Sequence, residues 1–154
     1  MEHSRKDLFP QGRPIFEGVS EGRRKNMQAN RSKNTKPEMT VRRVLHALGY
    51  RYRLHSKDLP GRPDIVFRGR RKIIQIHGCF WHGHGCVPLG VLPKSRLEYW
   101  GPKISSTKMR DKRNYDALVE LGWSILTLWE CDIRSSTYNL QDALSIFLEN
   151  TTAR

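Results

Sequence analysis

The apolar residues of this chain recur with two periods, which divide it into helices and strands. A helical period predicts a helix that begins after Thr35 and ends at Gly49. Glu38 follows Thr35 with the spacing of a capping box, so its side chain has a sufficient structural role as a cap. The same period predicts a last helix over Asn139 to Leu148.

Short apolar runs bounded by glycine, proline and charged residues predict four strands. They lie at 50–54, 65–67, 72–77 and 123–129. Before the last strand, the pattern predicts a short helical turn at 96–100 and a separate basic helix at 103–121. The expected fold class is therefore α/β, with a mixed central sheet flanked by helices.

Charge and composition change this picture at the N-terminus. Residues 1–25 are polar and basic, so they predict a flexible arm ahead of a single domain over 26–154. Lys and Arg number 28 against 15 Asp and Glu, a net charge of +13, which favours nucleic acid as a partner and an anionic membrane second. No apolar run approaches the roughly 18–20 residues of a membrane span, and no signal-peptide core is present, so we expect a cytosolic protein.

The stretch from Ile76 to Cys86 has the composition of a metal site. It holds two of the three cysteines and three of the six histidines, interleaved with glycines. Structural zinc takes four Cys or His ligands. Three of them would be the cysteines, Cys79, Cys86 and Cys131. The fourth would be one of three histidines between which spacing does not choose: His77, His82 and His84.

The two remaining histidines are suited to proton transfer, because imidazole titrates near neutral pH. Asp64 stands at the start of the strand 65–67 and, with Glu38, offers oxygen ligands to a hard cation such as Mg²⁺. An Asp after Pro63 is also typical of a turn, so a purely local role is the alternative. In a basic protein, these groups together favour metal-assisted phosphodiester hydrolysis.

Phe80 and Trp81 form an aromatic pair between Gly78 and Gly83. Projected from a metal-held loop, they are suited to wedge between base pairs. Such insertion costs least where pairing is poor, so a mismatch or lesion is the natural target. The alternative is that both rings pack the loop onto the core. The basic residues of helix 103–121 either follow phosphates or form a solvated face.

Four motifs occur in order along the chain. They are Pro60-Gly61-Arg62-Pro63-Asp64, then His77-Gly78-Cys79-Phe80-Trp81-His82 with His84 and Cys86, then Leu121-Gly122-Trp123, then Trp129-Glu130-Cys131. Together they resemble the very short patch repair (Vsr) DNA mismatch endonuclease family, and the match runs from about Asn26 to Arg134. The resemblance implies a restriction-endonuclease-like fold with one structural zinc. It also implies nicking of double-stranded DNA 5′ to the T of a T:G mismatch, which arises from 5-methylcytosine deamination.

The resemblance further implies a role for each matching residue. Asp64 and the Ile76 main-chain carbonyl would bind a catalytic Mg²⁺, and His82 would activate the attacking water. His77 and Glu38 would support the metal waters and the leaving group, so Glu38 would be more than a cap. The implied zinc ligands are Cys79, His84, Cys86 and Cys131.

Phe80, Trp81 and Trp100 resemble the aromatic residues that intercalate beside the mismatch. Contact with DNA is also expected for three other residues: Met27, Arg62 and Lys103. The family implies a monomeric, cytoplasmic and nucleoid-associated bacterial protein. Its expected partners are a functionally paired cytosine-5 DNA methyltransferase and the mismatch-repair protein MutL.

Two features depart from the expected pattern. Nucleases of this fold usually carry an acidic-x-Lys motif after the first Asp, where this chain has Gln75-Ile76-His77, so histidine chemistry must replace the lysine. Thr107 stands where the family has an Asn for mismatch contact, and Gly83 and Gly85 interrupt its histidine run. The alternatives are a restriction- or homing-type nuclease that cuts paired DNA and a non-catalytic, zinc-stabilised mismatch-binding protein.

Overall fold

The structure, a computed structural model, describes residues 21–22, 33–88, 90–94 and 96–150. Nearly all of these belong to one compact unit, Asn34–Arg154. Met27 and almost all of the predicted N-terminal arm lie outside the described residues. No helix in the described part of the chain is long and apolar enough to cross a lipid bilayer.

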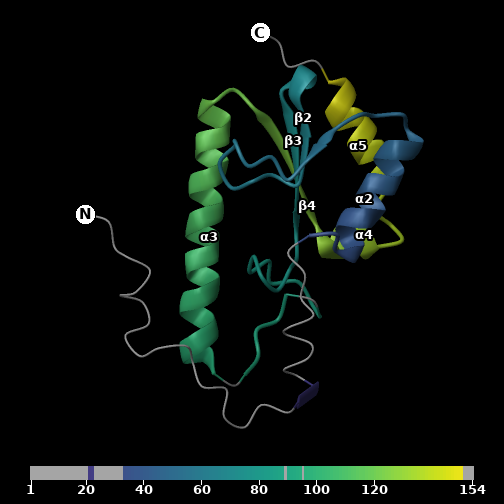
Figure 1. The fold of residues 1–154 in the computed structure, drawn as a ribbon. Helices are drawn as coiled ribbons and strands as arrows, with labels where there is room; N and C mark the ends of the chain where they lie inside the picture. Colours follow the sequence, from purple (N-terminus) through teal and green to yellow (C-terminus); the bar gives the residue numbers. More distant parts are fainter. Residues whose placement is uncertain (1–20, 23–32, 89, 95, 151–154) are drawn as a thin grey trace. The chain divides into compact units, whose positions relative to one another are not determined.

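A four-stranded mixed sheet in the order β1-β2-β3-β4 forms the centre of this unit (Figure 1). The strands are β1 (Arg53–Leu54), β2 (Ile65–Phe67), β3 (Lys72–His77) and β4 (Ser124–Trp129), with the 3₁₀ turn η1 (Arg68–Arg70) between β2 and β3. The first two pairs are antiparallel, whereas β3 and β4 are parallel and pair His77 with Trp129. The segments that follow His77 and Trp129 therefore leave the sheet side by side, at the carboxyl ends of β3 and β4.

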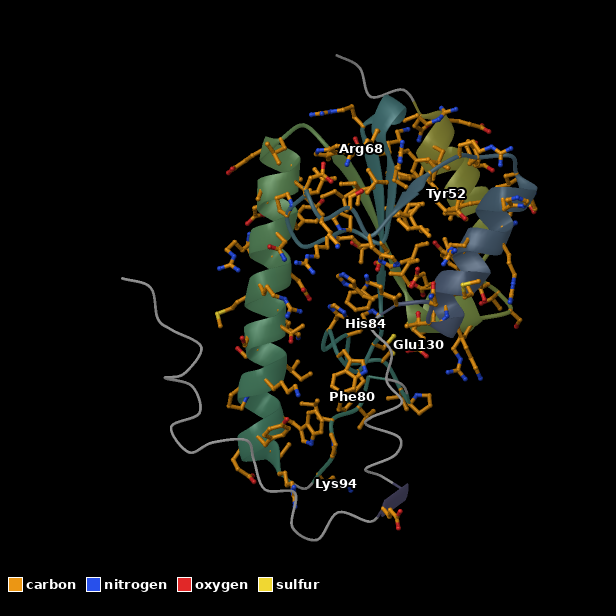
Figure 2. The ribbon with its side chains drawn as sticks, viewed as in Figure 1. Tyr52, Arg68, Phe80, His84, Lys94 and Glu130 are labelled. Atoms are coloured by element: carbon orange, nitrogen blue, oxygen red, sulfur yellow. The ribbon has the colours of Figure 1, made fainter. Side chains whose placement is uncertain are left out.

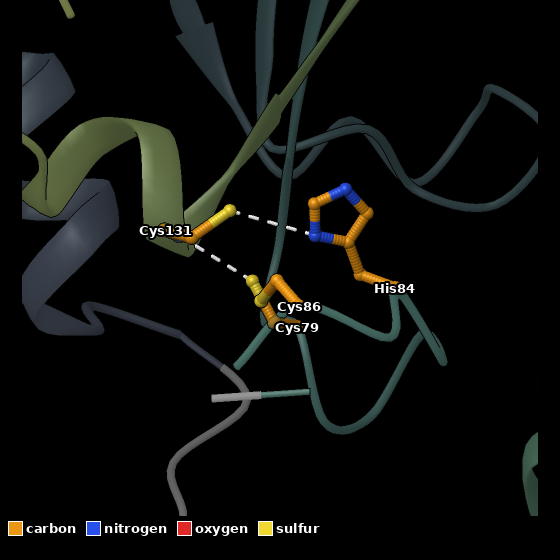
Figure 3. Close-up of side chains that lie close together, drawn as sticks. All are labelled: Cys79, His84, Cys86 and Cys131. Carbon is orange, nitrogen blue, oxygen red and sulfur yellow. Dashed lines mark hydrogen bonds between the residues drawn. The ribbon is translucent and has the colours of Figure 1, made fainter. Parts of the chain in front are cut away.

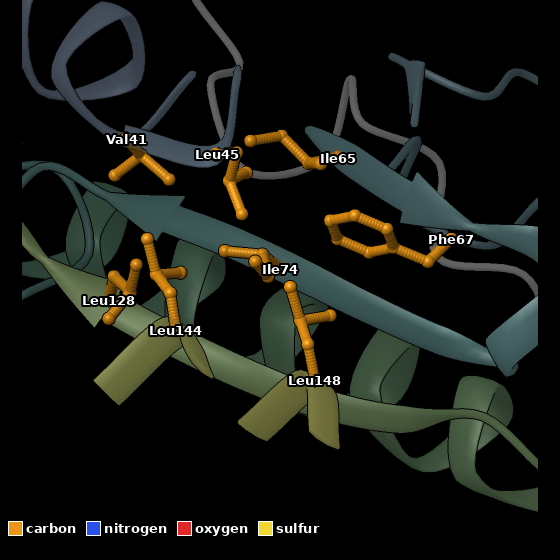
Figure 4. Packing of buried hydrophobic residues seen from close by; sticks show 8 residues of the cluster. All are labelled: Val41, Leu45, Ile65, Phe67, Ile74, Leu128, Leu144 and Leu148. Carbon is orange, nitrogen blue, oxygen red and sulfur yellow. The ribbon is translucent and has the colours of Figure 1, made fainter. Parts of the chain in front are cut away.

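Helices α2 (Lys36–Ala47) and α5 (Leu140–Glu149) cover one face of the sheet (Figure 1). Their apolar stripes and the inward side chains of the strands form one buried cluster, drawn in Figure 4. Its members are Val41, Leu45, Ile65, Phe67, Ile74, Leu128, Leu144 and Leu148. Since each such side chain contributes about 1.5–3 kcal/mol on burial, this cluster is the main core.

A single long helix, α3 (Leu97–Glu120), covers the other face (Figure 1). Its Leu118 packs in a second buried cluster with Leu59, Val66, Ile73 and Trp123. The prediction of two separate helices at 96–100 and 103–121 was wrong. Pro102 lies inside the helix, close to its start, where it removes one backbone hydrogen bond without ending the helix.

Other elements differ in detail from the sequence prediction. The first strand was expected at 50–54, but only Arg53–Leu54 pair with β2. A short helix, α4 (Glu130–Arg134), follows β4 and was not predicted. The last helix runs over Leu140–Glu149 with Asn139 as its N-cap. The predicted α/β class, with a mixed sheet between helices, is confirmed.

Candidate active site and metal centre

Three cysteines and one histidine converge where β3 and β4 end (Figure 3). They are Cys79, His84, Cys86 and Cys131, and their ligand atoms all lie within 4.8 Å of one another. Cys79 is fully buried, and its Sγ accepts a 3.3 Å hydrogen bond from the Cys131 N–H. Three cysteines and one histidine are a donor set typical of structural zinc sites, so this cluster could hold a metal ion.

The fold selects His84 from the three candidate histidines. Its ring stacks on Trp129 with the centroids 4.1 Å apart, and its Nδ1 lies 3.5 Å from Cys131 Sγ. His77 and His82 stack on each other instead. Because β3 and β4 are parallel neighbours, the loop after His77 and the helix after Trp129 begin side by side.

The surroundings of Cys79 change the acidity of its thiol. Burial raises the pKa of the Cys79 thiol to about 12, and the neighbouring thiols of Cys86 and Cys131 contribute to the rise. A metal ion has the opposite effect, because it binds the thiolate and lowers the thiol pKa. A bound cation would therefore offset the effect of burial on the Cys79 thiol.

A second group of metal-binding side-chain types contains His77, His82 and Asp111. The two imidazole rings are parallel, with centroids 3.9 Å apart, and His82 Nδ1 lies 2.5 Å from Asp111 Oδ2. Burial, followed by the charge of His82, lowers the pKa of His77 to about 4, so His77 is neutral at neutral pH. Burial acts to raise the pKa of Asp111, but the hydrogen bond and charge of His82 outweigh it and hold that pKa below its usual value.

These three side chains line an open cleft beside α3. The strands contribute Gln75, Thr127 and Trp129 to the lining, and α3 contributes Lys108, Lys112 and Tyr115. A cleft that combines a histidine–carboxylate pair with lysine side chains suits an anionic substrate such as a DNA backbone.

Asp64 immediately precedes β2, and its Oδ2 accepts a 2.8 Å hydrogen bond from the Ile76 N–H on β3. Burial raises the pKa of Asp64 and the Glu38 carboxylate adds to the rise, whereas the Ile76 hydrogen bond and the charges of His55 and His82 lower it. The side chain thus bonds to the neighbouring strand and interacts with groups from three other segments. It does not make the local turn contact that was its alternative interpretation.

Glu38 is buried on α2, with 2% of its surface exposed. The predicted cap is present, because the Glu38 N–H donates to Thr35 Oγ1 at 3.4 Å and Glu38 Oε2 accepts from the Asn34 N–H at 2.7 Å. The other oxygen, Oε1, lies 3.0 Å from His55 Nε2 and 3.6 Å from an Arg42 guanidinium nitrogen. The Glu38 carboxylate therefore caps α2 and also faces His55, whose ring stands next to Asp64.

The three predicted aromatic residues, Phe80, Trp81 and Trp100, form one cluster with ring centroids 5.0 to 6.0 Å apart. All three are partly exposed, and none belongs to either buried core cluster. Figure 2 shows Phe80 in the loop beyond the end of the sheet. Phe80 and Trp81 therefore pack on each other and on Trp100 of α3, and their insertion into DNA stays a prediction.

Two residues expected to contact DNA are described by the structure, and one of them, Lys103, lies beside these rings. Lys103 Nζ lies 5.8 Å from the Trp81 ring centroid and 5.6 Å from that of Trp100. Arg62 is exposed in the turn before β2, with a positive φ of 52°. Thr107, the departure from the family pattern, donates its hydroxyl to the Lys103 carbonyl at 3.1 Å within α3.

Sequence reasoning missed two residues of this site, Asp111 and His55. Asp111 is the acidic residue inside the basic run 108–113 of α3, and that interruption was the available signal. His55 gave no such signal, because only the pairing of β1 with β2 brings it to Asp64.

Comparisons with known proteins agree with this geometry. The family model described as DNA mismatch endonuclease Vsr matches residues 19–88. The chain is 58% identical over 113 residues to the type II nicking enzyme V.XorIIP of Xanthomonas oryzae pv. oryzae. This match covers 73% of this chain and 82% of that protein. It is 40% identical over 127 residues to the DNA mismatch endonuclease Vsr of Escherichia coli strain K12, covering 82% and 81%. It is 39% identical over 136 residues to the type II nicking enzyme V.NaeI of Lentzea aerocolonigenes, covering 85% and 77%.

The fold, the cleft and these relatives define a DNA endonuclease. More specifically, the chain belongs to the Vsr DNA mismatch endonuclease family, and its α/β fold is of the restriction-endonuclease type. The resemblance inferred from the four motifs is confirmed.

Proposed function

We propose that this protein nicks duplex DNA 5′ to the T of a T:G mismatch, by Mg²⁺-dependent hydrolysis that leaves a 5′-phosphate and a 3′-hydroxyl. Such a nick would start very short patch repair of deaminated 5-methylcytosine. The observation that carries the proposal is the His82–Asp111 pair in an open, lysine-lined cleft, close enough to Asp64 for His82 to influence its pKa.

His82 is the group that accepts a proton from the attacking water. When Nδ1–H is donated to ionised Asp111, the lone pair on Nε2 is free to take that proton, and the carboxylate stabilises the imidazolium that forms. A positioned general base contributes about 10²- to 10⁴-fold to a rate. His77, stacked on the His82 ring, restricts its rotation and, with Glu38, supports the metal waters and the leaving group.

Asp64 and the Ile76 main-chain carbonyl would hold the Mg²⁺, because both present the oxygen ligands that this ion prefers. The Ile76 N–H fixes Asp64 Oδ2, which leaves Oδ1 to meet a cation. When bound, Mg²⁺ supplies positive charge at the phosphate as the nucleophile enters and the leaving group departs. The raised pKa of Asp64 supports this fit, since a nearby cation offsets the cost of a part-buried carboxylate.

We assign Zn²⁺ to the cluster of Cys79, His84, Cys86 and Cys131. Four protein ligands close the coordination sphere, which makes the site structural in kind. Its function would be to fix the loop that carries His82 and the aromatic pair onto the ends of β3 and β4.

The aromatic cluster of Phe80, Trp81 and Trp100 would enter the duplex beside the mismatch. Separating a base step costs a few kcal/mol, and a mismatched step costs least, so this wedge would favour mismatched DNA. The residues assigned to further DNA contacts are Met27, Arg62 and Lys103.

The remaining assignments follow the family. Residues 1–25 would be a basic arm and residues 26–154 one endonuclease domain, acting as a monomer in the bacterial cytoplasm at the nucleoid. Its partners would be a cytosine-5 DNA methyltransferase and MutL. A second candidate function, a nuclease that cuts a paired recognition sequence, is suggested by the relatives named type II nicking enzymes.

The test uses end-labelled duplexes, one with a T:G mismatch and one fully paired, with randomised flanking sequence and with Mg²⁺ present or chelated. We expect a nick in the T strand of the mismatched duplex only, lost on chelation. Cutting of paired DNA would move the protein to the second candidate function, and binding without cutting would make it a mismatch reader. Asp64→Ala provides the control, because it should bind the mismatched duplex without nicking it.

A further inference from the structure

His55 occupies a strained backbone conformation next to the proposed catalytic carboxylate. It directly follows β1 and has a φ of +48°, a left-handed conformation that a residue with a Cβ adopts only at a cost. Its N–H donates a 3.0 Å hydrogen bond to the Asp64 carbonyl, so the backbones of the two residues are tied together. Strain of this kind persists where the surrounding structure enforces it, and it concentrates at functional sites.

The strained backbone places the His55 imidazole between two carboxylates. Nε2 lies 3.0 Å from Glu38 Oε1, and Nδ1 lies 3.9 Å from Asp64 Oδ1. The side chains of His55 and Glu38 are 16% and 3% exposed. Within the described chain, neither His55 Nε2 nor Glu38 Oε1 has a hydrogen-bond partner of normal geometry. The other charged group near Glu38 Oε1 is the Arg42 guanidinium, which at 3.6 Å is farther away than His55.

This geometry has a consequence for the carboxylates. Asp64 has one oxygen fixed by the Ile76 N–H, and Glu38 has one oxygen fixed by the Asn34 N–H. In each case the other oxygen is the one that faces His55. A single imidazole therefore faces both carboxylates through opposite nitrogens of one ring, 3.0 Å from Glu38 and 3.9 Å from Asp64.

We propose that His55 is a positioning residue of the catalytic centre, which holds Glu38 and Asp64 in one relative orientation for binding of the divalent cation. The proposal rests on the proposed function, in which Asp64 binds Mg²⁺. Groups that orient metal ligands typically change metal affinity or activity by about 10- to 100-fold when removed.

Three substitutions distinguish the orientation of the carboxylates by His55 from the mere packing of its ring. The Gln side chain can bring an amide nitrogen to the position of Nε2, facing Glu38, whereas Ala removes both ring contacts. His55→Gln and His55→Ala retain the same strained φ, so the difference between them reports the contact with Glu38. The control is His46→Ala, which removes an exposed imidazole near the end of α2.

Two readouts are needed. Nicking of a T:G duplex is measured against Mg²⁺ concentration, which separates the half-saturating Mg²⁺ concentration from the maximal rate. Mn²⁺ binding is measured by electron paramagnetic resonance without DNA, with Asp64→Ala to define binding at this site. Melting temperature and zinc content show whether each variant is folded.

We expect His55→Ala to weaken Mn²⁺ binding and raise the half-saturating Mg²⁺ concentration by about tenfold or more. His55→Gln should restore a substantial part of the Mn²⁺ affinity and of the Mg²⁺ response. His46→Ala should match the wild type in both measurements. The proposal is overturned if folded His55→Ala binds Mn²⁺ within twofold of wild type. It is equally overturned if Gln and Ala are impaired alike. Failure of the wild type to nick T:G DNA would instead reject the proposed function, and the Mn²⁺ comparison would still decide the role of His55.

Discussion

His82 on the loop after β3 is joined to Asp111 on α3 by a 2.5 Å contact between Nδ1 and Oδ2. The two residues are far apart in sequence, and the contact crosses the cleft from the loop to the helix. It fixes both the direction of the imidazole and its tautomer, provided that Asp111 is ionised, which its lowered pKa ensures at neutral pH. The pair therefore directs the Nε2 lone pair away from α3.

Asp111→Asn should reduce the nicking rate strongly while leaving DNA binding intact. An amide keeps the size of the side chain, but it no longer stabilises the imidazolium and can donate to Nδ1, which selects the wrong tautomer. By analogy with the carboxylate of a serine protease triad, the loss in maximal rate should be about 10²- to 10⁴-fold. Single-turnover nicking rates and the dissociation constant for the T:G duplex provide the measurement.

The matched control is Asp116→Asn, on the same helix. Asp116 pairs with Lys112 at 2.7 Å and is half exposed, so its loss should change the nicking rate little. An Asp111→Asn protein that nicked at the wild-type rate would remove the His82–Asp111 pair from the mechanism.

Asp64→Asn should abolish nicking and yet raise stability in the absence of a divalent cation. The pKa of Asp64 is raised above 3.8 in the folded protein, mainly by burial, so at neutral pH the charged form disfavours folding. An Asn oxygen can still accept the Ile76 hydrogen bond, while the charge is removed. We expect the melting temperature to rise by on the order of 2–4 °C at pH 7 in chelator.

The stability gained by Asp64→Asn depends on pH, because the pKa of Asp64 is higher in the folded chain than in the unfolded one. Below a pH of 3.8 the carboxyl group is protonated in both folded and unfolded chains, and the advantage of the Asn variant disappears. Above the raised pKa of the folded state the advantage is complete. A variant that was less stable than the wild type at pH 7 would show that the Asp64 charge is already compensated in the free protein.

Cys131→Ser should destabilise the fold and not merely slow the chemistry. Cys131 lies in the first turn of α4 and meets three proposed ligands from the loop after β3, so a bound zinc ion would tie two segments together. Loss of one thiolate should lower the zinc content and reduce the melting temperature by on the order of 10 °C. Ser136→Ala, an exposed change after the same helix, is the control and should alter neither quantity.

The parts of the fold that the sequence predicted well are those set by local patterns. The helix after Thr35 and the last helix have apolar stripes and capping residues within their own sequences. The merger of two predicted helices into α3 was missed because Pro102 is normally read as a break. The buried residues of α3, Ile104 and Leu118, both follow Pro102, so tertiary packing that no local pattern contains holds the part of the helix after the proline.

In the candidate site, too, some features follow from local sequence and others depend on tertiary packing. Residue composition predicted that the cysteines form one cluster, whereas the presence of His84 in it depends on the parallel pairing of β3 with β4. Asp111 and His55 reach the site from a helix and a strand end whose positions depend on tertiary packing. Their roles therefore could not be inferred from the spacing of motifs.

Gly83 and Gly85, two glycines of the same loop, allow a last prediction. Both have a positive φ, +62° and +78°, so an alanine at either position carries about 1–2 kcal/mol of backbone strain. A Cβ on Gly85 would meet nothing within 4 Å, whereas a Cβ on Gly83 would lie 2.6 Å from Ile104 Cγ2 and would also collide with the Lys108 side chain. Lys108 can move, but Ile104 is buried with 6% exposed.

Gly83→Ala should therefore cost about 1–3 kcal/mol more than Gly85→Ala in the free energy of unfolding. Because Gly83 adjoins His82, the collision should also displace the imidazole from Asp111 and lower the nicking rate more than Gly85→Ala does. Chemical denaturation and single-turnover nicking of both variants, with zinc content as a check on the neighbouring ligands, provide the comparison. Equal stabilities and equal rates would mean that the loop moves away from α3 without consequence, and that the close packing of Gly83 does not hold His82 in place.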